Sequence, residues 1–157
     1  MSESSIVFLL MDKTNQQIIN LEKNNLNLSR LKNIINLIFH NENIRQDKQL
    51  NIVITNNKYL KELNSKFKNL DRPTDVLSFP FDNKFLPENL SILGDVYISL
   101  EKAKEQAVQY KVSLQNEIER LMIHGILHLI GYTHNDKDKD KEMTEKTEYY
   151  LNKIAKS

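Results

Sequence analysis

Apolar residues recur with two different periods along this 157-residue chain, and this mixture constrains the fold more than any other feature. Between residues 29 and 39 they follow the helical spacing i, i+3, i+4, with Ser29 as the expected N-cap. Between residues 50 and 55 they alternate with polar residues, as in a strand with one exposed face. A chain that carries both patterns is expected to be an α+β protein with a small mixed sheet.

The remaining segments extend the pattern to about four strands and about five helices. Strands are expected at residues 6–11, 50–55, 74–79 and 92–98. Helices are expected at residues 29–39, 56–67, 99–110, 113–130 and 139–154, with Ser99 and Ser113 as caps of the third and fourth. Three prolines and three glycines are too few for a long hinge, so residues 1–157 are expected to form a single domain.

Composition excludes several classes of protein. The chain has no cysteine, which rules out a thiolate nucleophile, a disulfide framework and a cysteine zinc ribbon. With 22 basic and 21 acidic residues, the whole-molecule charge does not attract nucleic acid or a membrane, so any such binding must be local. Residues 6–11 lack the basic leader of a signal peptide, and no apolar run approaches a membrane span. We therefore expect a cytoplasmic protein.

Three of the four histidines lie in one short segment, His124-Gly-Ile-Leu-His128-Leu-Ile-Gly131-Tyr-Thr-His134. On a helix, His124 and His128 share one face a single turn apart. Gly131 stands where a helix C-terminus favours positive φ, and such a turn would bring His134 back to the other two. Three histidine ligands with an open fourth position are typical of a catalytic zinc, so the segment predicts one Zn²⁺ ion at the end of this helix.

A single histidine on an apolar helix face is more often a hydrogen-bonded core residue, but a metal satisfies three imidazoles at once. Nickel, copper or iron could occupy the same site. The spacing also matches the zinc-protease motif H-E-x-x-H-x-x-G-x-x-H except at Gly125, where that motif has the glutamate that activates water. Peptide hydrolysis by that route is disfavoured, so another group must move protons or the substrate must bring its own nucleophile.

Residues 58–72 carry five basic and two acidic side chains, a local charge of +3. Such a segment is usually the solvated face of a helix. Beside a divalent metal, however, a lysine or arginine stabilises the charge that a phosphodiester gains in its transition state. RNA also carries a 2′-hydroxyl that could serve as the internal nucleophile.

Three segments resemble the YbeY-type metal-dependent endoribonucleases, which are bacterial ribosomal RNA maturation factors. Residues 124–134 are similar to the family signature H-G-x-L-H-L-x-G-Y-D-H, residues 72–81 to its P-T-D-V-L-S-F-P-F run, and residues 93–98 to its L-G-D-I segment. The resemblance implies a zinc held by His124, His128 and His134. It also implies a cleft that cleaves single-stranded RNA, including the 3′ end of 16S ribosomal RNA, with the small ribosomal subunit as partner and neither DNA nor a membrane.

The sequence departs from the family pattern at two positions. The family has a Tyr-Arg pair before the P-T-D run, whose arginine is taken to be important for activity, and this chain has Phe67-Lys68 there. Lysine keeps the charge but loses the planar fork that grips a phosphate, so Lys68 and the nearby Arg72 are the expected catalytic cations. Thr133 replaces an aspartate before the last histidine, and its hydroxyl would support that ligand more weakly.

Other polar residues of these segments are expected to support the metal ligands or to contact RNA: Asp75, Ser78, Asp95 and Thr133. Both aspartates could instead cap a turn or end a strand. Glu117 is expected in a surface ion pair, and residues 136–142 are expected to form a solvated helix start.

Two further hypotheses remain open on the sequence. One is a ribosome-assembly binding module with a structural metal. It differs from the nuclease in its fourth coordination position, which a protein side chain would fill in a structural site and a water in a catalytic one. The other is a metzincin-like metallohydrolase of peptides, which a glutamate reaching the metal-bound water from elsewhere in the fold would revive.

Overall fold

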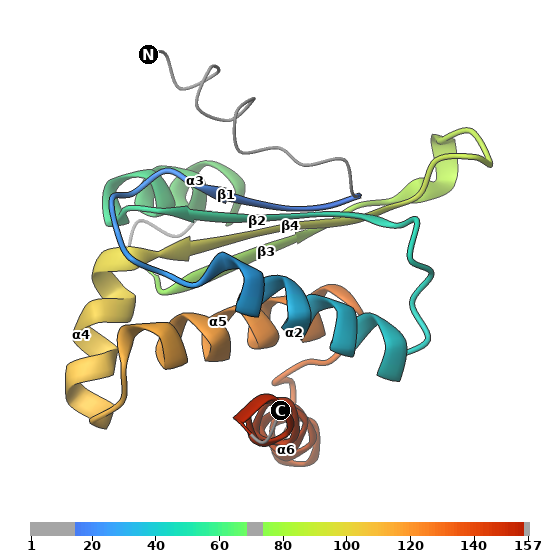
Figure 1. The fold of residues 1–157 in the computed structure, drawn as a ribbon. Coiled ribbons are helices and arrows are strands. Elements are labelled where there is room, and N and C mark those ends of the chain that lie inside the picture. The colour runs from blue at the N-terminus through green and yellow to red at the C-terminus, as the bar shows by residue number, and fades with distance from the viewer. Residues whose placement is uncertain (1–14, 69–73, 156–157) are drawn as a thin grey trace.

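A four-stranded mixed sheet forms the centre of the molecule in the computed structural model, which describes residues 15–68 and 74–155 (Figure 1). The strands are β1 (Gln16–Asn20), β2 (Gln49–Thr55), β3 (Val76–Pro80) and β4 (Ile92–Ser99). Their order is β1-β2-β4-β3, with β1, β2 and β4 parallel and β3 antiparallel to β4. The mixed sheet predicted from the sequence is confirmed, whereas the strand expected at residues 6–11 lies outside the described residues.

Strand β1 is the element that the sequence pattern missed, because its sequence QQIIN does not alternate clearly between polar and apolar residues. Gln16 is buried at its start, and its side-chain Nε2 donates to the carbonyls of Gln46 and Lys48 at 2.8 and 2.7 Å. A buried polar side chain is tolerated where it finds such partners. The strand therefore joins the sheet through polar as well as apolar contacts.

The five predicted α-helices are confirmed in the described part of the chain. They are α2 (Leu28–Asn41), α3 (Asn57–Lys68), α4 (Leu100–Tyr110), α5 (Leu114–Leu129) and α6 (Lys137–Ala155), with a short 3-10 helix, η1 (Asn83–Phe85). Ser99 and Ser113 cap α4 and α5 as predicted. The cap predicted for the first helix is wrong: Asn27 caps α2 by accepting from the Arg30 amide at 3.1 Å, and Ser29 already lies inside the helix.

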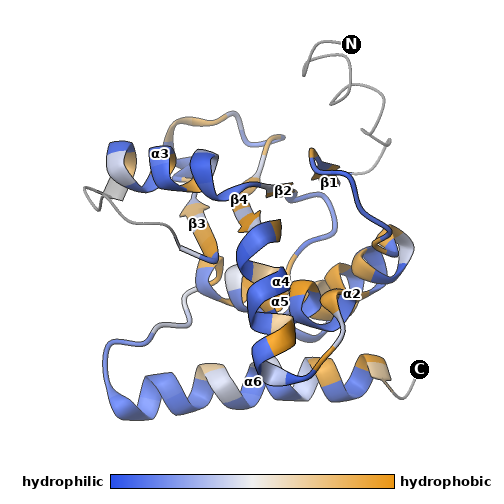
Figure 2. Ribbon diagram, turned by 90° about the vertical axis from the view of Figure 1, so that its left-hand side faces the viewer, coloured by the Kyte–Doolittle hydropathy of each residue, from blue (hydrophilic) through white to orange (hydrophobic). Residues whose placement is uncertain are grey.

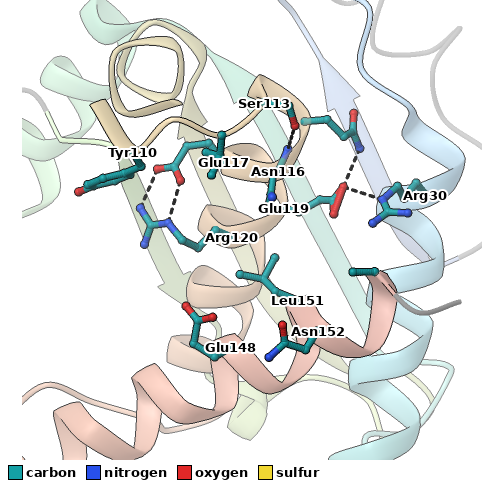
Figure 3. A pocket seen from close by; sticks show the side chains of 13 residues that line it. Arg30, Tyr110, Ser113, Asn116, Glu117, Glu119, Arg120, Glu148, Leu151 and Asn152 are labelled. Carbon is teal, nitrogen blue, oxygen red and sulfur yellow. Dashed lines mark hydrogen bonds and ion pairs between the residues drawn. The ribbon is translucent and has the colours of Figure 1, made fainter. Parts of the chain in front are cut away.

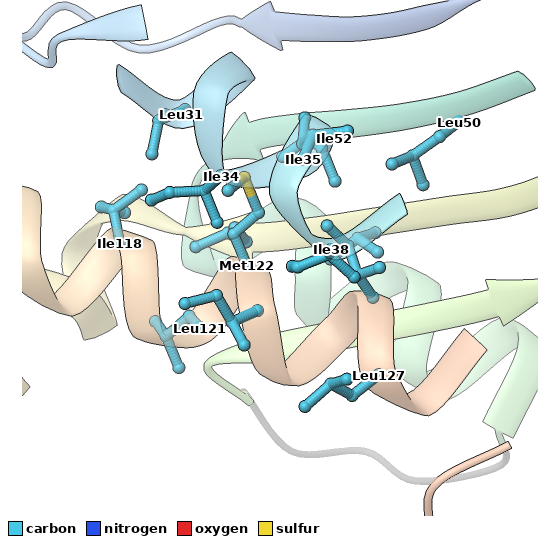
Figure 4. Packing of buried hydrophobic residues seen from close by; sticks show 14 of the residues in the cluster. Leu31, Ile34, Ile35, Ile38, Leu50, Ile52, Ile118, Leu121, Met122 and Leu127 are labelled. Atoms are coloured by element: carbon cyan, nitrogen blue, oxygen red, sulfur yellow. The ribbon is translucent and has the colours of Figure 1, made fainter. Parts of the chain in front are cut away.

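The helices lie in layers about the sheet. Helix α3 covers one face, α2 and α5 cover the other, and α6 packs beyond them (Figure 1). Most of the core lies between the sheet and the pair α2 and α5, where Ile34, Ile38, Ile52 and Met122 are fully buried (Figure 4). Strands β3 and β4 are largely hydrophobic, while α3 and α6 are mostly hydrophilic (Figure 2). None of the described helices could span a membrane.

Candidate active site

Helix α5 meets the sheet at Gly125, directly after the first histidine of the motif. Gly125 is buried, and a Cβ atom there would lie 2.5 Å from Val96 Cγ1 of β4. The Ser78 hydroxyl of β3 donates to the Gly125 carbonyl at 2.9 Å. Glycine thus allows the histidine helix to pack closely against β3 and β4. The glutamate of the zinc-protease motif has no room at this position.

The turn after α5 has the geometry predicted for Gly131. This glycine has a φ of +109°, and its N–H donates to the His128 carbonyl at 3.2 Å. The N–H of Tyr132 reaches back to the Leu127 carbonyl at 3.1 Å, which completes a Schellman motif. The chain therefore reverses immediately after the helix and carries His134 back towards its face.

The outer two histidines of the motif converge. Their Nε2 atoms lie 3.0 Å apart, and the rings of His124 and His134 stack with centroids 4.8 Å apart and 20° between their planes. Two nitrogen ligands of a tetrahedral zinc lie about 3.3 Å apart, given Zn–N bonds of about 2.0–2.1 Å. The separation of the two nitrogens is therefore close to that between adjacent corners of a zinc tetrahedron.

His128 does not complete a three-ligand group here. It is exposed, one turn beyond His124 on the same helix. Within residues 15–68 and 74–155, no three side chains of the metal-ligating types are grouped closely enough to hold an ion. The structure thus brings together two of the three predicted ligands, and the three-histidine centre stays a prediction.

The surroundings of His124 favour its neutral form. Burial, and then the proximity of His134, lowers the pKa of His124 to about 4. At neutral pH its imidazole is uncharged and keeps a lone pair for a cation. The charge of Asp75 raises this pKa and the charge of Arg120 lowers it, so both groups lie near the ring.

A carboxylate from α6 orients His134. The Asp140 carboxylate pairs with His134 Nδ1, on the opposite edge of the ring from Nε2. Such a pair fixes the tautomer and ring orientation of a metal-binding histidine. The sequence interpretation treated residues 136–142 as a solvated helix start and missed this role, because acidic residues are common in the first turn of any helix. Thr133 Oγ1, beside His134 in the chain, is buried without a partner among the described residues.

The turn and α6 are tied to α2 through Glu42. Its carboxylate accepts from the Tyr132 hydroxyl at 2.7 Å, the Tyr150 hydroxyl at 2.9 Å and Lys146 Nζ at 3.2 Å. Burial raises the pKa of Glu42, but these three hydrogen bonds outweigh it and leave the pKa below its usual value. Glu42 therefore anchors the segment that presents His134.

A polar cluster lies beside His124, on the side of β3 and α4. Asp75 accepts from the Val76 amide at 2.8 Å and from Gln106 Nε2 at 3.1 Å. Hydrogen bonding to Glu117 raises the pKa of Arg120, to which the charge of Asp75 also contributes. The cluster thus places one carboxylate and one guanidinium near the first histidine.

Arg120 is a residue that the sequence interpretation missed. It lies exactly one i, i+4 step before His124, so helical spacing from the first histidine could have found it. Its Nε and Nη2 atoms donate to the two oxygens of Glu117 at 2.8 and 2.7 Å. The ion pair predicted for Glu117 therefore exists, but its surface location is wrong, since the Glu117 side chain is only 1% exposed.

Asp95 lies away from the histidines. Val96 faces α5 at Gly125, so its neighbours in β4, Asp95 and Tyr97, point to the opposite face of the sheet. There Asp95 accepts from Asn51 Nδ2 at 3.0 Å. The structure thus gives Asp95 a cross-strand partner and does not bring it to the predicted metal ligands.

The remaining predicted residues divide into two groups. Ser78 is buried and holds the backbone of the histidine helix, as described above. Lys68 is the last residue of α3, and its side chain lies outside the described part of the structure, as does all of Arg72. The catalytic role expected for these two cations stays a prediction.

Comparison with known proteins identifies the family. Residues 11–155 match the family model described as Endoribonuclease YbeY. The chain belongs to the YbeY family of endoribonucleases. The resemblance drawn from the three sequence segments is therefore confirmed.

Relatives named Endoribonuclease YbeY match most of this YbeY-family chain. That of Acetivibrio thermocellus is 35% identical over 139 residues, covering 81% of this chain and 86% of the relative. That of Aquifex aeolicus is 41% identical over 110 residues, covering 69% and 72%. The solution structure of TM1509 from Thermotoga maritima is similar with a TM-score of 0.58 and 29% identity, over 88% of each chain.

Proposed function

We propose that this YbeY-family protein is a zinc-dependent endoribonuclease that cleaves single-stranded RNA. One Zn²⁺ would be held by His124, His128 and His134. The observation that carries the proposal is the convergence of His124 and His134 Nε2 at 3.0 Å. Two further observations agree with it: Asp140 orients the His134 ring, and the low pKa of His124 keeps that imidazole neutral.

The side chains around this centre suit phosphodiester cleavage. When bound, zinc would supply Lewis-acid stabilisation of the charge that develops on the phosphate. Arg120 lies near His124, but Glu117 balances its charge, so Lys68 and Arg72 are the cations proposed to act on the phosphate. Because Gly125 supplies no carboxylate, we assign the attack to the 2′-hydroxyl of the RNA. In that attack the 2′-oxygen would bond to phosphorus and the bond from phosphorus to the 5′-oxygen would break, leaving a 2′,3′-cyclic phosphate and a 5′-hydroxyl. Solvent would accept the proton of the 2′-hydroxyl and return one to the leaving 5′-oxygen, so a glutamate at position 125 is not required.

The proposed substrate is the 3′ region of 16S ribosomal RNA, in contact with the small ribosomal subunit in the cytoplasm. Membership of the YbeY family supports this choice through the resemblance of the three motif segments. The net charge of only +1 agrees with a substrate that is held locally.

The test compares 16S ribosomal RNA 3′ ends in cells that carry the wild-type protein, His128→Ala or Lys68→Ala. His40→Ala serves as the matched control, because His40 is an exposed histidine at the end of α2. We expect unprocessed ends in the first two variants and normal ends in the control. Normal ends in His128→Ala would refute the nuclease assignment. Normal ends in Lys68→Ala alone would refute only the role of that lysine.

A further inference from the structure

A cavity of about 640 Å³ lies between the start of α5, the end of α4 and the last turns of α6, and the proposed chemistry does not use it (Figure 3). Its size is within the range of small-molecule sites. Its walls include the aromatic ring of Tyr110, the guanidinium of Arg120, and the side chains of Asn116, Glu148 and Asn152.

Arg120 connects the cavity with the histidine site. It lines the cavity, and it lies one helical turn, about 5.4 Å along the axis, before His124. Glu117 occupies one edge of the guanidinium, through Nε and Nη2, which leaves the Nη1 edge for another acceptor. The cavity wall therefore comes within one helical turn of the first histidine.

The charges of the cavity do not favour an anion inside it. Arg120 pairs with buried Glu117, and Arg30 pairs with buried Glu119 at 2.8 Å, so each arginine is neutralised. Glu148 adds a negative charge to the wall. A free phosphate would therefore be repelled from the interior, whereas an uncharged ligand would not.

The other walls suit a flat ring with polar edges. Tyr110 is 52% exposed, and its ring already faces the Arg120 guanidinium at 5.6 Å. Bases of single-stranded RNA stack on such aromatic rings and on arginine planes. The side-chain amides of Asn116 and Asn152 both line the cavity, and an amide can donate to and accept from a base edge.

We propose that this cavity binds one nucleobase of the RNA strand, stacked on Tyr110 and hydrogen-bonded by Asn116 and Asn152. The inference rests on the proposed function and adds to it a subsite beside the metal centre. It assigns binding roles to Tyr110 and Asn152, and it predicts that one position of the RNA is recognised as a base.

The test measures RNA affinity by fluorescence anisotropy, with a labelled single-stranded 2′-O-methyl oligonucleotide that lacks the attacking hydroxyl. Tyr110→Ala is compared with Tyr149→Ala, a matched control because Tyr149 is 45% exposed on α6 and does not line the cavity. We expect Tyr110→Ala to weaken binding by about 5- to 150-fold, the range of one lost base–aromatic stack. Asn152→Ala, an exposed change that leaves the core intact, should weaken it several-fold.

A scan of single abasic sites along the oligonucleotide locates the bound base. At one position the loss of the base should weaken binding to the wild type by the same factor as Tyr110→Ala does. The same abasic site should cause no further loss of affinity in the Tyr110→Ala variant. Unchanged affinity in both Tyr110→Ala and Asn152→Ala would overturn the inference, and would be the result if a protein side chain were the occupant. In that case RNA binding by the wild type would leave the proposed function standing. A wild type that binds no RNA would overturn both.

Discussion

The close approach of α5 to the sheet at Gly125 predicts that an added methyl group destabilises the protein. In Gly125→Ala the new Cβ would lie 2.5 Å from Val96 Cγ1 and 3.2 Å from Ser78 Oγ. Carbon atoms in contact prefer about 3.5–4.0 Å, so the helix and strand must separate by about 1 Å. Val96 is fully buried and β-branched, so its side chain cannot rotate away easily.

Two effects of opposite sign set the magnitude. Alanine gains about 1 kcal/mol over glycine in a helix interior. Overpacking a well-packed core costs about 1–3 kcal/mol. For Gly125→Ala in the wild type we expect a net loss of up to about 2 kcal/mol in the free energy of unfolding. In a Val96→Ala background the contact is absent, so the same change should stabilise by about 1 kcal/mol.

The assay is urea unfolding followed by far-ultraviolet circular dichroism, for the wild type, both single variants and the double variant. The coupling energy between the two positions should be about 1–3 kcal/mol. The reasoning would be refuted if Gly125→Ala stabilised the wild type and the coupling were below about 0.5 kcal/mol.

Three further predictions concern charged groups. Asp140→Asn should weaken zinc affinity by about 10- to 100-fold in competition with a chelator; Asp138→Asn is the control, and equal losses in both would contradict the pairing with His134. The pKa of Glu42 is lower in the folded protein, so its contribution to stability is present above the usual value of 4.5 and is lost as the pH falls below it. Measured by urea unfolding, the free energy of unfolding should therefore fall more steeply between about pH 7 and about pH 3 for the wild type than for Glu42→Gln. Parallel pH dependences of the two proteins would exclude the hydrogen-bond network around Glu42. Arg120→Ala leaves a buried carboxylate unpaired and should cost about 3–5 kcal/mol, a loss that a second change, Glu117→Gln, should partly restore.

The sequence predicted those features that depend on local rules. Ser99, Ser113 and Gly131 act where capping chemistry and positive φ are needed, and each has its determinants within a few residues. The pairing of Asp140 with His134 depends on how α6 packs, and no local pattern distinguishes that aspartate from its acidic neighbours. Tertiary contacts therefore decide this pairing, whereas the place of Arg120 beside His124 follows from helical spacing alone.

The difference between local rules and tertiary contacts also explains why the sequence placed Asp95 near the histidines. Its motif segment is adjacent to the site in the fold, but strand alternation turns its side chain to the other face. The sequence shows the alternation, but it does not show which face α5 covers. That choice follows from the packing of Gly125 against Val96.

The converging histidines are only ten residues apart, and a locally closed turn joins them. Closing so short a loop carries a small entropic penalty, so little of the long-range fold is needed to bring these rings together. A cation held by them would therefore also have some affinity for the unfolded chain. Because the cation also binds the unfolded chain, it would stabilise the native state by less than its affinity for the folded protein implies. Binding of the cation could then precede folding.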